Sequence, residues 1–542
     1  MNNKQTTNIK NYFFFIIVYF SVMVIYEIVS YLTFPHLHMR ITPSFLLVEI
    51  PITLVLINIF YLPHLKSRVV KYLFPLIPLF SLYISFDIFY SYLQKSPRLS
   101  DFDNLTTIYN FFPKMFFGIM LSIFLIILII SLVFLYSKKF YKAKAFRNTI
   151  IARVSILLFL IIFLQTDTFI SYQNKTFEFA RWSNKRTIHD NGKISSFIYY
   201  SNLESRNRKI LEQQGSNKIN INKTLYPYNL VDRPNIYMVV LESFINPNYL
   251  KYIQYDKNPL SIKLEKHLYN QKFSRIISPV YGGRTAQAEF ELLTGIKAFA
   301  KVGSIEFNIL EGGAVNSFLH QLRANGYKTN ATIATESSYF NSKIAYKSLG
   351  FEQVTYLEEE KNFKRDNEDI MIFDGDLFNY NINKVKEQLA NSKQPFFNYL
   401  LGVYGHMPFY RNIKKRPDII EPINVKNELV KKLANQFYYR TDALAKYIDK
   451  ILEIDSNAII IISSDHLPPS LLNDAIQYKY DLKVNIALLI NKGQAIDISG
   501  KKQYEIPWLI WDTLSNRQNS RNLDSKILEQ LYYKALYRGI QK

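Results

Sequence analysis

The chain has no cysteine among its 542 residues, and its 44 acidic residues are outnumbered by 66 lysines and arginines. The absence of cysteine excludes disulfide bonds and thiolate metal ligands, although it does not by itself identify the redox compartment. The shortage of acid gives a formal net charge of +22. Such a charge can attract nucleic acid, but the sequence carries no nucleic-acid-binding motif. A basic protein at a membrane more simply meets anionic lipid headgroups, so we expect a membrane partner and no nucleic acid.

The first 170 or so residues are dominated by apolar side chains. Five runs are long enough to cross a hydrocarbon core, which needs roughly 20 helical residues. They cover residues 12–34, 44–62, 72–93, 116–136 and 150–168. The segment "NNKQTTNIKNYFFFIIVYF" enters the first run without a small-residue cleavage site, so we expect the first helix to be retained.

Basic residues are concentrated in alternate loops between these runs, which predicts the orientation of the helices. They precede the first run, separate the second from the third, and separate the fourth from the fifth. These loops are therefore expected in the cytoplasm. An odd number of spans then places the rest of the chain outside. The predicted organisation is a transmembrane domain over 1–168, a connecting arm over 169–230 and an extracytoplasmic domain over 231–542.

Three carboxylates lie inside the first three runs, at Glu27, Glu49 and Asp87. Helical spacing places all three in the outer part of the bilayer, where an unpaired charge is costly. They could form a shared cavity that receives a basic side chain from the arm, such as Arg181 or Lys185. Two alternatives stay open: each carboxylate reaches water at the interface, or the cavity holds the polar end of a lipid.

The extracytoplasmic part alternates β-branched or aromatic runs with helical patterns, which favours an α/β domain with a largely parallel sheet. The expected strands are "NIYMVVLES", "YKTNATIAT", "PFFNYLLGVYGH" and "NAIIIISSDH", and the expected helices include "VNSFLHQLRANGY" and "QFYYRTDALAKYIDKIL". Three of the strands end in Glu242, His406 and the pair Asp465-His466. Ligands gather at the carboxyl ends of strands in such sheets, so these residues are expected in one site.

A fourth element of this site is the stretch "SPVYGGRTAQAEFELLTG". Gly282 and Gly283 free the backbone so that successive N–H groups can face an anion, and Arg284 adds charge beside them. Thr285 then opens a helix whose positive end faces the same place. The simpler interpretation is a Gly-Gly turn capped by a threonine.

Glu242, Asp465, His466 and the Thr285 hydroxyl together form a ligand set that suits one divalent metal: Mn²⁺, Zn²⁺ or Mg²⁺. Such a metal would lower the pKa of the hydroxyl and stabilise charge on a phosphoryl oxygen. Taken singly, a glutamate at a strand end is usually a cap or a salt bridge, and an Asp-His pair is often a turn. Asp374 and Asp376 are interpreted in the same simple way, as a turn and helix cap, and a second metal site at this acidic pair is the alternative.

The motifs "VVLESF", "PVYGGRTAQAEFELLTG", "YGHMPF" and "IIISSDH" resemble the lipoteichoic acid synthase-like branch of the alkaline phosphatase/sulfatase superfamily. Five membrane spans before an outward domain resemble the same family. The resemblance implies an α/β catalytic domain in which Thr285 is the nucleophile. Glu242, Asp465 and His466 would be metal ligands together with Thr285, with Mn²⁺ preferred, and His406 would contact the substrate phosphate or stabilise the intermediate. From its residue type alone, His406 could equally act as general acid or base.

The resemblance also assigns a substrate side to the site. Gly283, Arg284, His406, Phe340 and Asn341 are its expected substrate-binding residues. The last two correspond to a Trp-Asn-Arg stretch of the polymer synthases, in which the phosphate-holding arginine is replaced here by Ser342. A missing guanidinium suits transfer of single groups better than chain elongation.

The reaction implied is transfer of a phosphoglycerol headgroup from a phospholipid such as phosphatidylglycerol, through Thr285, to a hydroxyl of an envelope glycan or polymer. The location implied is the bacterial inner (cytoplasmic) membrane, with several spans and an outward catalytic domain. A phosphoethanolamine transferase acting on a glycan or lipopolysaccharide is the alternative, although that group resembles a disulfide-bearing domain. A non-catalytic sensor would lack ligands, and a sulfatase would need Cys or Ser where Thr285 stands.

Overall fold

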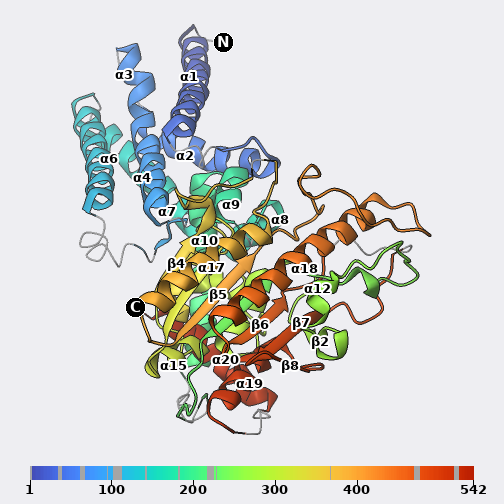
Figure 1. The fold of residues 1–542 in the computed structure, drawn as a ribbon. Helices are drawn as coiled ribbons and strands as arrows, with labels where there is room; N and C mark the ends of the chain where they lie inside the picture. The colour runs from blue at the N-terminus through green and yellow to red at the C-terminus, as the bar shows by residue number, and fades with distance from the viewer. Residues whose placement is uncertain are drawn as a thin grey trace. The chain divides into compact units, whose positions relative to one another are not determined.

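The structure is a computed structural model in which the chain divides into two compact units, Met1–Asn207 and Arg208–Lys542. The described residues are 3–33, 39–61, 67–93, 96–99, 101, 113–140, 143–180, 183–216, 225–226, 229–366, 368–468, 476–517 and 524–541. Figure 1 shows a helical N-terminal unit and a second unit built around a sheet.

In the part that the structure describes, the first unit is built from helices joined by short connections. Its elements are α1 (Asn3–Thr33), η1 (Phe45–Glu49), α2 (Ile50–Phe60), α3 (Arg68–Leu73), η2 (Phe74–Leu76), α4 (Ile77–Leu93), α6 (Pro113–Phe140), α7 (Ala143–Phe163), α8 (Asp167–Thr176), α9 (Asn184–Asn191) and α10 (Lys193–Gly215). Every predicted apolar run therefore contains helix. Expected arm residues form α8, α9 and α10, and α10 extends past the last residue of the first unit.

Fewer of these helices qualify as membrane spans than the five predicted. Among the described residues, Ile9–Thr33 and Arg68–Ser91 are long and apolar enough to cross a membrane. A third span results if Ile151–Phe163 and Asp167–Thr176, bent by 67°, count as one. Phe45–Phe60 and Phe116–Leu132 are apolar but fall in a shorter class of 10–17 residues. The structure thus supports two or three spans. More were predicted because the apolar composition continues across the breaks between helices, which hydropathy alone does not show.

The second unit contains an eight-stranded mixed sheet with the order β2-β7-β6-β1-β5-β3-β4, and β8 pairs with β7. The strands are β1 (Ile236–Leu241), β2 (Ser274–Ile277), β3 (Lys328–Ile333), β4 (Gln353–Tyr356), β5 (Phe396–Gly402), β6 (Ile459–Ser464), β7 (Val484–Asn491) and β8 (Gln494–Ile496). The central run β6-β1-β5-β3-β4 is parallel, as predicted. The antiparallel pairings of β7 with β6, β2 and β8 make the sheet mixed.

Strand β1 is buried on both sides, because its successive side chains enter two different cores. Ile236, Met238 and Val240 join one core, whereas Tyr237 and Val239 join the other. This is the pattern of a sheet covered by helices on both faces. The end of β1, which Glu242 follows, therefore lies in the middle of the sheet.

Helices from distant parts of the sequence cover the two faces. One core receives side chains from α13 (Thr285–Thr294), α14 (Glu306–Ile309), α15 (Phe318–Ala324), α16 (Ser342–Leu349), α19 (Ile506–Leu514) and α20 (Ser525–Ile540). The other receives them from α12 (Ile262–Glu265), α17 (Asp374–Asn391) and α18 (Glu428–Ile454). The long α18 lies across the sheet in Figure 1. Both predicted helices are present, as α15 and α18.

Candidate active site

The turn before Thr285 consists of three successive residues with left-handed backbone conformation. Gly282, Gly283 and Arg284 have φ angles of 69°, 126° and 69°. Arg284 pays a steric cost for this conformation, which glycine avoids. The turn ends at Thr285, the first residue of the ten-residue helix α13. Thr285 therefore lies at the end of α13 where backbone N–H groups without intrahelical partners give the helix a partial positive charge.

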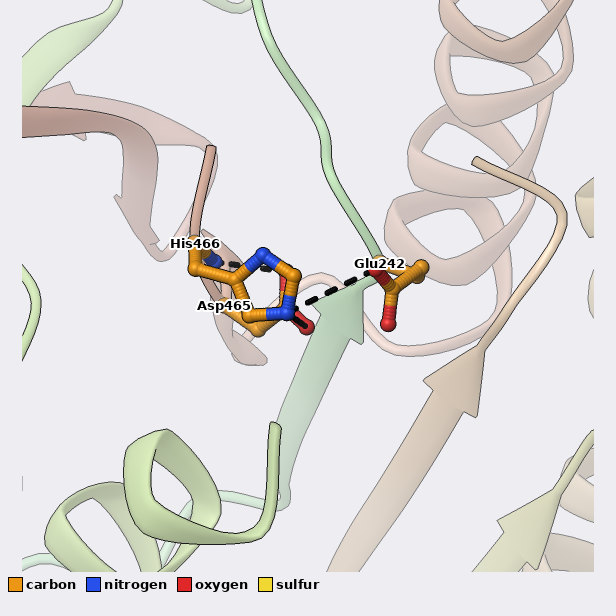
Figure 2. Close-up of side chains that lie close together, drawn as sticks. All are labelled: Glu242, Asp465 and His466. Carbon is orange, nitrogen blue, oxygen red and sulfur yellow. Dashed lines mark hydrogen bonds and ion pairs between the residues drawn. The ribbon is translucent and has the colours of Figure 1, made fainter. Parts of the chain in front are cut away.

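Three side chains from separate segments surround the Thr285 hydroxyl. Its Oγ1 lies 3.0 Å from Oε2 of Glu242, 2.8 Å from Oδ2 of Asp465 and 3.4 Å from Nε2 of His466. His466 Nε2 lies 3.5 Å from Oε1 of Glu242 and 3.3 Å from Oδ2 of Asp465, as Figure 2 shows. All four side chains are buried. The structure thus brings together the four residues that the sequence predicts as metal ligands.

The sheet register explains this convergence. Leu241 at the end of β1 pairs with Ser464 at the end of β6, and the two strands are parallel. Glu242 and Asp465 are the next residues on each strand, so their side chains emerge at the same edge. His466 follows Asp465 directly. The site is therefore built on two central strands and completed by the N-terminus of α13.

The donor set fits a divalent cation. Glu242, Asp465 and His466 each offer a ligand atom, and these atoms lie within 4.8 Å of one another. The single proton of the Thr285 hydroxyl can serve only one of the two carboxylates that it contacts. Two buried carboxylates converging on one point are electrostatically unfavourable unless a proton or a cation lies between them. Oxygen and imidazole ligands without thiolate suit Mn²⁺, Zn²⁺ or Mg²⁺.

The pKa values show how the residues alone balance this charge. Burial, with the nearby Glu242 carboxylate, raises the pKa of Asp465 to about 7. Burial also acts to raise the pKa of Glu242, but His466, Ser243 and His406 outweigh it, so that pKa is lowered. Burial opposes a charged His466, yet the two carboxylates raise its pKa. A cation bound here would displace protons from this cluster.

Backbone hydrogen bonds hold the ligands in orientation. Oδ1 of Asp465 accepts from the backbone N–H of Ser243 at 2.8 Å and of His466 at 2.6 Å. The Ser243 hydroxyl donates to Oε1 of Glu242 at 2.8 Å. Nδ1 of His466 lies 3.0 Å from the carbonyl oxygen of Leu467. If Nδ1 donates its proton there, Nε2 is left with the lone pair that a metal needs.

A buried ion pair behind Glu242 was not anticipated from the sequence. Arg440 donates from Nε to Oδ2 of Asp374 at 2.6 Å and from Nη2 to the backbone oxygen of Glu242 at 3.0 Å. Asp374 begins α17, as expected, but its carboxylate faces Arg440 rather than capping the helix. A β-carbon on Gly405 would clash with both the backbone oxygen of Glu242 and the guanidinium of Arg440. Arg440 is therefore packed tightly against the backbone that carries Glu242.

Another buried carboxylate near the site, Glu289, lies on α13, four residues beyond Thr285. Glu289 accepts hydrogen bonds from the Tyr346 hydroxyl at 2.5 Å and the Tyr399 hydroxyl at 2.6 Å. Burial raises its pKa to about 7, and the charges of Asp465 and Glu242 act in the same direction. The sequence signal was the Glu-Phe pair within the helix, which gave no indication of the two tyrosine partners.

The expected substrate-side residues differ in their surroundings. His406, in the turn after β5, is exposed and lies close enough to the cluster for its imidazole to act to lower the pKa of Glu242. Arg284 is exposed, and a β-carbon on Gly283 would meet nothing within 4 Å. Gly283 and Arg284 directly precede Thr285 in the chain, so they lie beside the cluster.

Phe340 and Asn341 lie in the turn before α16. Both have positive φ angles, 52° and 58°. The Asn341 side-chain amide donates to the backbone oxygens of Phe307 and Leu310, both at 2.9 Å. Phe340 is partly buried against the main core. Their roles in substrate binding stay predictions, and Asn341 has only its side-chain oxygen left for a ligand.

Residues 234–532 match the Sulfatase family. A Rhizobium meliloti protein assigned to cyclic beta-1,2-glucan modification is 27% identical over 244 residues, which cover 44% of this chain and 36% of that protein. An uncharacterized Haemophilus influenzae protein is 25% identical over 191 residues, covering 33% of each. The matched region thus spans about a third of the length of these curated relatives.

Two solved structures of low sequence identity are similar to part of this chain. The lipoteichoic acid synthase LtaP of Listeria monocytogenes has a TM-score of 0.45 and 17% identity, covering 59% of this chain and 81% of its own. The Streptococcus pyogenes phosphoglycerol transferase GacH has a TM-score of 0.44 and 17% identity, covering 62% and 91%. Because the family match spans more than half of the residues, the chain belongs to the Sulfatase family.

Proposed function

We propose that this chain is a membrane-anchored phosphotransferase that moves a phosphoglycerol-type headgroup from a phospholipid to a hydroxyl of an envelope glycan or polymer. The observation that carries the proposal is the Thr285 hydroxyl, buried at the start of α13 within 3.4 Å of Glu242, Asp465 and His466. A threonine that lies among metal-type ligands at a helix N-terminus is suited to act as a nucleophile. It would attack the phosphorus atom of an anionic phosphate group.

Glu242, Asp465, His466 and Thr285 would hold one divalent cation, with Mn²⁺ preferred to Mg²⁺ or Zn²⁺. When bound, it lowers the pKa of the hydroxyl and offsets charge on the phosphoryl oxygens. The protein's own contribution is to orient Thr285 through α13 and to present the N–H groups of the Gly283–Arg284 turn to the phosphate.

Two displacements complete the transfer. In the first, the Oγ1–P bond of Thr285 forms while the bond from phosphorus to the diacylglycerol oxygen breaks. The hydroxyl proton passes to water, and His406 gives a proton to the departing oxygen. In the second, His406 takes the proton of the acceptor hydroxyl as that oxygen attacks phosphorus. The Oγ1–P bond breaks, and Thr285 regains a proton from water.

A glycan acceptor is supported by the Rhizobium meliloti relative, which is assigned to cyclic beta-1,2-glucan modification. The serine at position 342, where the resemblance expects a phosphate-holding arginine, supports transfer of single groups over polymer elongation. Phosphatidylglycerol is the proposed donor. Phosphoethanolamine is the alternative headgroup. The absence of cysteine argues against it, because the phosphoethanolamine transferases are expected to have a catalytic domain with disulfide bonds.

The proposed location is the inner membrane of a bacterium, with residues 1–168 as a membrane domain whose N-terminus is cytoplasmic. Five spans require the two shorter apolar helices, Phe45–Phe60 and Phe116–Leu132, to cross the membrane as well. Residues 169–230 would connect it to an extracytoplasmic catalytic domain, 231–542. The support is the series of apolar helices in the first unit and the alternation of basic loops between them. Anchoring of this kind keeps the site close to its lipid donor.

The test uses the full chain in liposomes with Mn²⁺, a cyclic glucan, and phosphatidylglycerol labelled in its headgroup glycerol. Labelled glucan is expected with the wild type and with Thr513→Ala, a control at an exposed threonine of α19. Thr285→Ala should give none. Label transferred equally by Thr285→Ala would overturn the proposal, and transfer from labelled phosphatidylethanolamine alone would replace phosphoglycerol by phosphoethanolamine.

A further inference from the structure

The helical unit contains an apolar cavity of about 270 Å³. Helices α2, α4, α6, α7 and α10 each contribute to its walls. Representative side chains are Leu56, Phe86, Ile119, Ile161 and Ile198, one from each helix. The cavity opens to the surface, where Leu82 and Ile161 are 43% and 45% exposed, and its walls offer water too few hydrogen-bond partners. The cavity therefore suits a hydrocarbon occupant.

Polar and charged side chains are also part of the lining. Tyr83, Arg98, Asp101 and Lys193 contribute beside the aliphatic residues. Lys193 pairs with Asp87 at 2.6 Å, and both side chains are nearly inaccessible. This ion pair neutralises the charge of Lys193. The lysine therefore gives the cavity wall a polar surface with little net charge. A molecule with a long hydrocarbon part and a polar end matches such a lining.

The wall formed by α10 is held firmly at its first turn. Glu49 accepts from the backbone N–H groups of Lys193, Ile194 and Ser195 at 3.2, 3.1 and 2.7 Å. The Tyr83 hydroxyl donates to the same carboxylate at 2.6 Å. A carboxylate at a helix N-terminus satisfies N–H groups and matches the helix dipole. The cavity thus has a preformed wall.

These contacts answer the question raised by the carboxylates of the apolar runs. Asp87 pairs with a basic residue of the arm, Lys193, which the sequence did not single out, and Arg181 lies outside the described residues. Glu49 binds the start of α10, and Glu27 accepts from the backbone N–H of Met39 at 2.7 Å. The polar cluster is thus occupied by the protein itself. The adjoining apolar cavity is the space left for a lipid.

We propose that this cavity holds one acyl chain of the glycerophospholipid donor during transfer. The inference rests on the proposed function for the identity of the donor. Its own support is the apolar lining, the neutralised Lys193 within it, and its place among helices that include candidate membrane spans, α4 and the α7–α8 pair. In that setting the available hydrocarbon is the acyl chain of a lipid. The cavity would select donors by chain length, independently of the headgroup chemistry at Thr285.

The experiment compares two adjacent residues of α7. Ile161 lines the cavity, whereas Ile162 is 65% exposed and is not part of its lining. Full-length wild type, Ile161→Trp and Ile162→Trp are reconstituted with phosphatidylglycerol that carries a photoactivatable group on its acyl chain. Three quantities are measured: cross-linked peptides, transfer from long-chain and four-carbon phosphatidylglycerol, and hydrolysis of a soluble glycerophosphodiester.

We expect wild type and Ile162→Trp to be labelled on α4 and α7. Ile161→Trp should show several-fold less labelling and several-fold less transfer from the long-chain lipid, with unchanged transfer from the four-carbon lipid and unchanged soluble hydrolysis. Equal labelling of the two variants would overturn the cavity as a lipid site. Reduced labelling with unchanged long-chain transfer would overturn the donor assignment. A wild type that is labelled and hydrolyses the soluble substrate, but transfers from no lipid, would instead contradict the proposed function.

Discussion

Replacing Arg440 by methionine should weaken metal binding without touching a metal ligand. In the structure its guanidinium donates to Asp374 at 2.6 Å and to the Glu242 backbone oxygen at 3.0 Å, and its side chain is 2% exposed. Removing one partner of a buried ion pair costs about 3–5 kcal/mol of stability. That is less than the roughly 5–15 kcal/mol that holds a typical domain together, so a folded fraction should remain.

The effect on the site comes from losing the anchor of Glu242. Loss of a group that orients a metal ligand typically lowers metal affinity by roughly 10- to 100-fold, which corresponds to about 1.4–2.7 kcal/mol. Arg440→Lys keeps the charge but not the forked geometry, so it should recover stability more than affinity. The matched control is Lys446→Met on the same helix, because Lys446 makes an exposed pair with Asp442 that contributes about 0–1 kcal/mol.

The assay is calorimetric titration of the metal-stripped, full-length protein with Mn²⁺, accompanied by thermal unfolding. Arg440→Met should bind Mn²⁺ at least tenfold more weakly, and Lys446→Met should match the wild type. An Arg440→Met protein that is folded and binds Mn²⁺ with wild-type affinity would refute the reasoning, because Glu242 would then be held in place without the guanidinium.

Three further outcomes are expected. His466→Ala should lose activity through lost metal affinity, and excess Mn²⁺ should partly restore it; no recovery at any Mn²⁺ concentration would count against a ligand role. Lys193→Met should lower the melting temperature of the full chain in detergent because it strands Asp87, and adding Asp87→Leu should recover part of the loss. Burial raises the pKa of Glu291 to about 8, so the folded state keeps a proton that the unfolded state releases above its ordinary value of 4.5. That contribution to stability is complete below about pH 4.5 and is lost as the pH rises through about 8, so melting temperatures over this range should fall less steeply for Glu291→Gln.

The sequence predicted the centre of the sheet because β1 and β6 are apolar runs that lead directly into polar residues. Glu242 and Asp465 could be placed together since parallel strands end at one edge, and the register of β1 with β6 has this arrangement. The antiparallel edge was not predicted. The apolar run of β7 resembles that of a parallel strand, and its direction depends on pairing with β6 and β2.

The partners of buried charges could not be predicted, for a related reason. Helical periodicity indicates that Arg440 faces inward, but not that its guanidinium reaches a strand end near Asp374. The arm contains several basic residues, and the sequence does not show which of them pairs with Asp87. Lys193 is the partner because α10 begins there, next to Asp87. Hydropathy likewise found the apolar runs but not the breaks between their helices.

The most direct test of the account is the mass of the peptide that contains Thr285. The full-length protein is incubated with Mn²⁺ and phosphatidylglycerol but no acceptor, quenched in acid, digested and analysed by mass spectrometry. We predict a mass increase equal to one phosphoglycerol group, located on Thr285 and lost when a cyclic glucan is added before quenching. An unmodified Thr285 in a preparation that still releases diacylglycerol and transfers the headgroup would contradict the covalent mechanism.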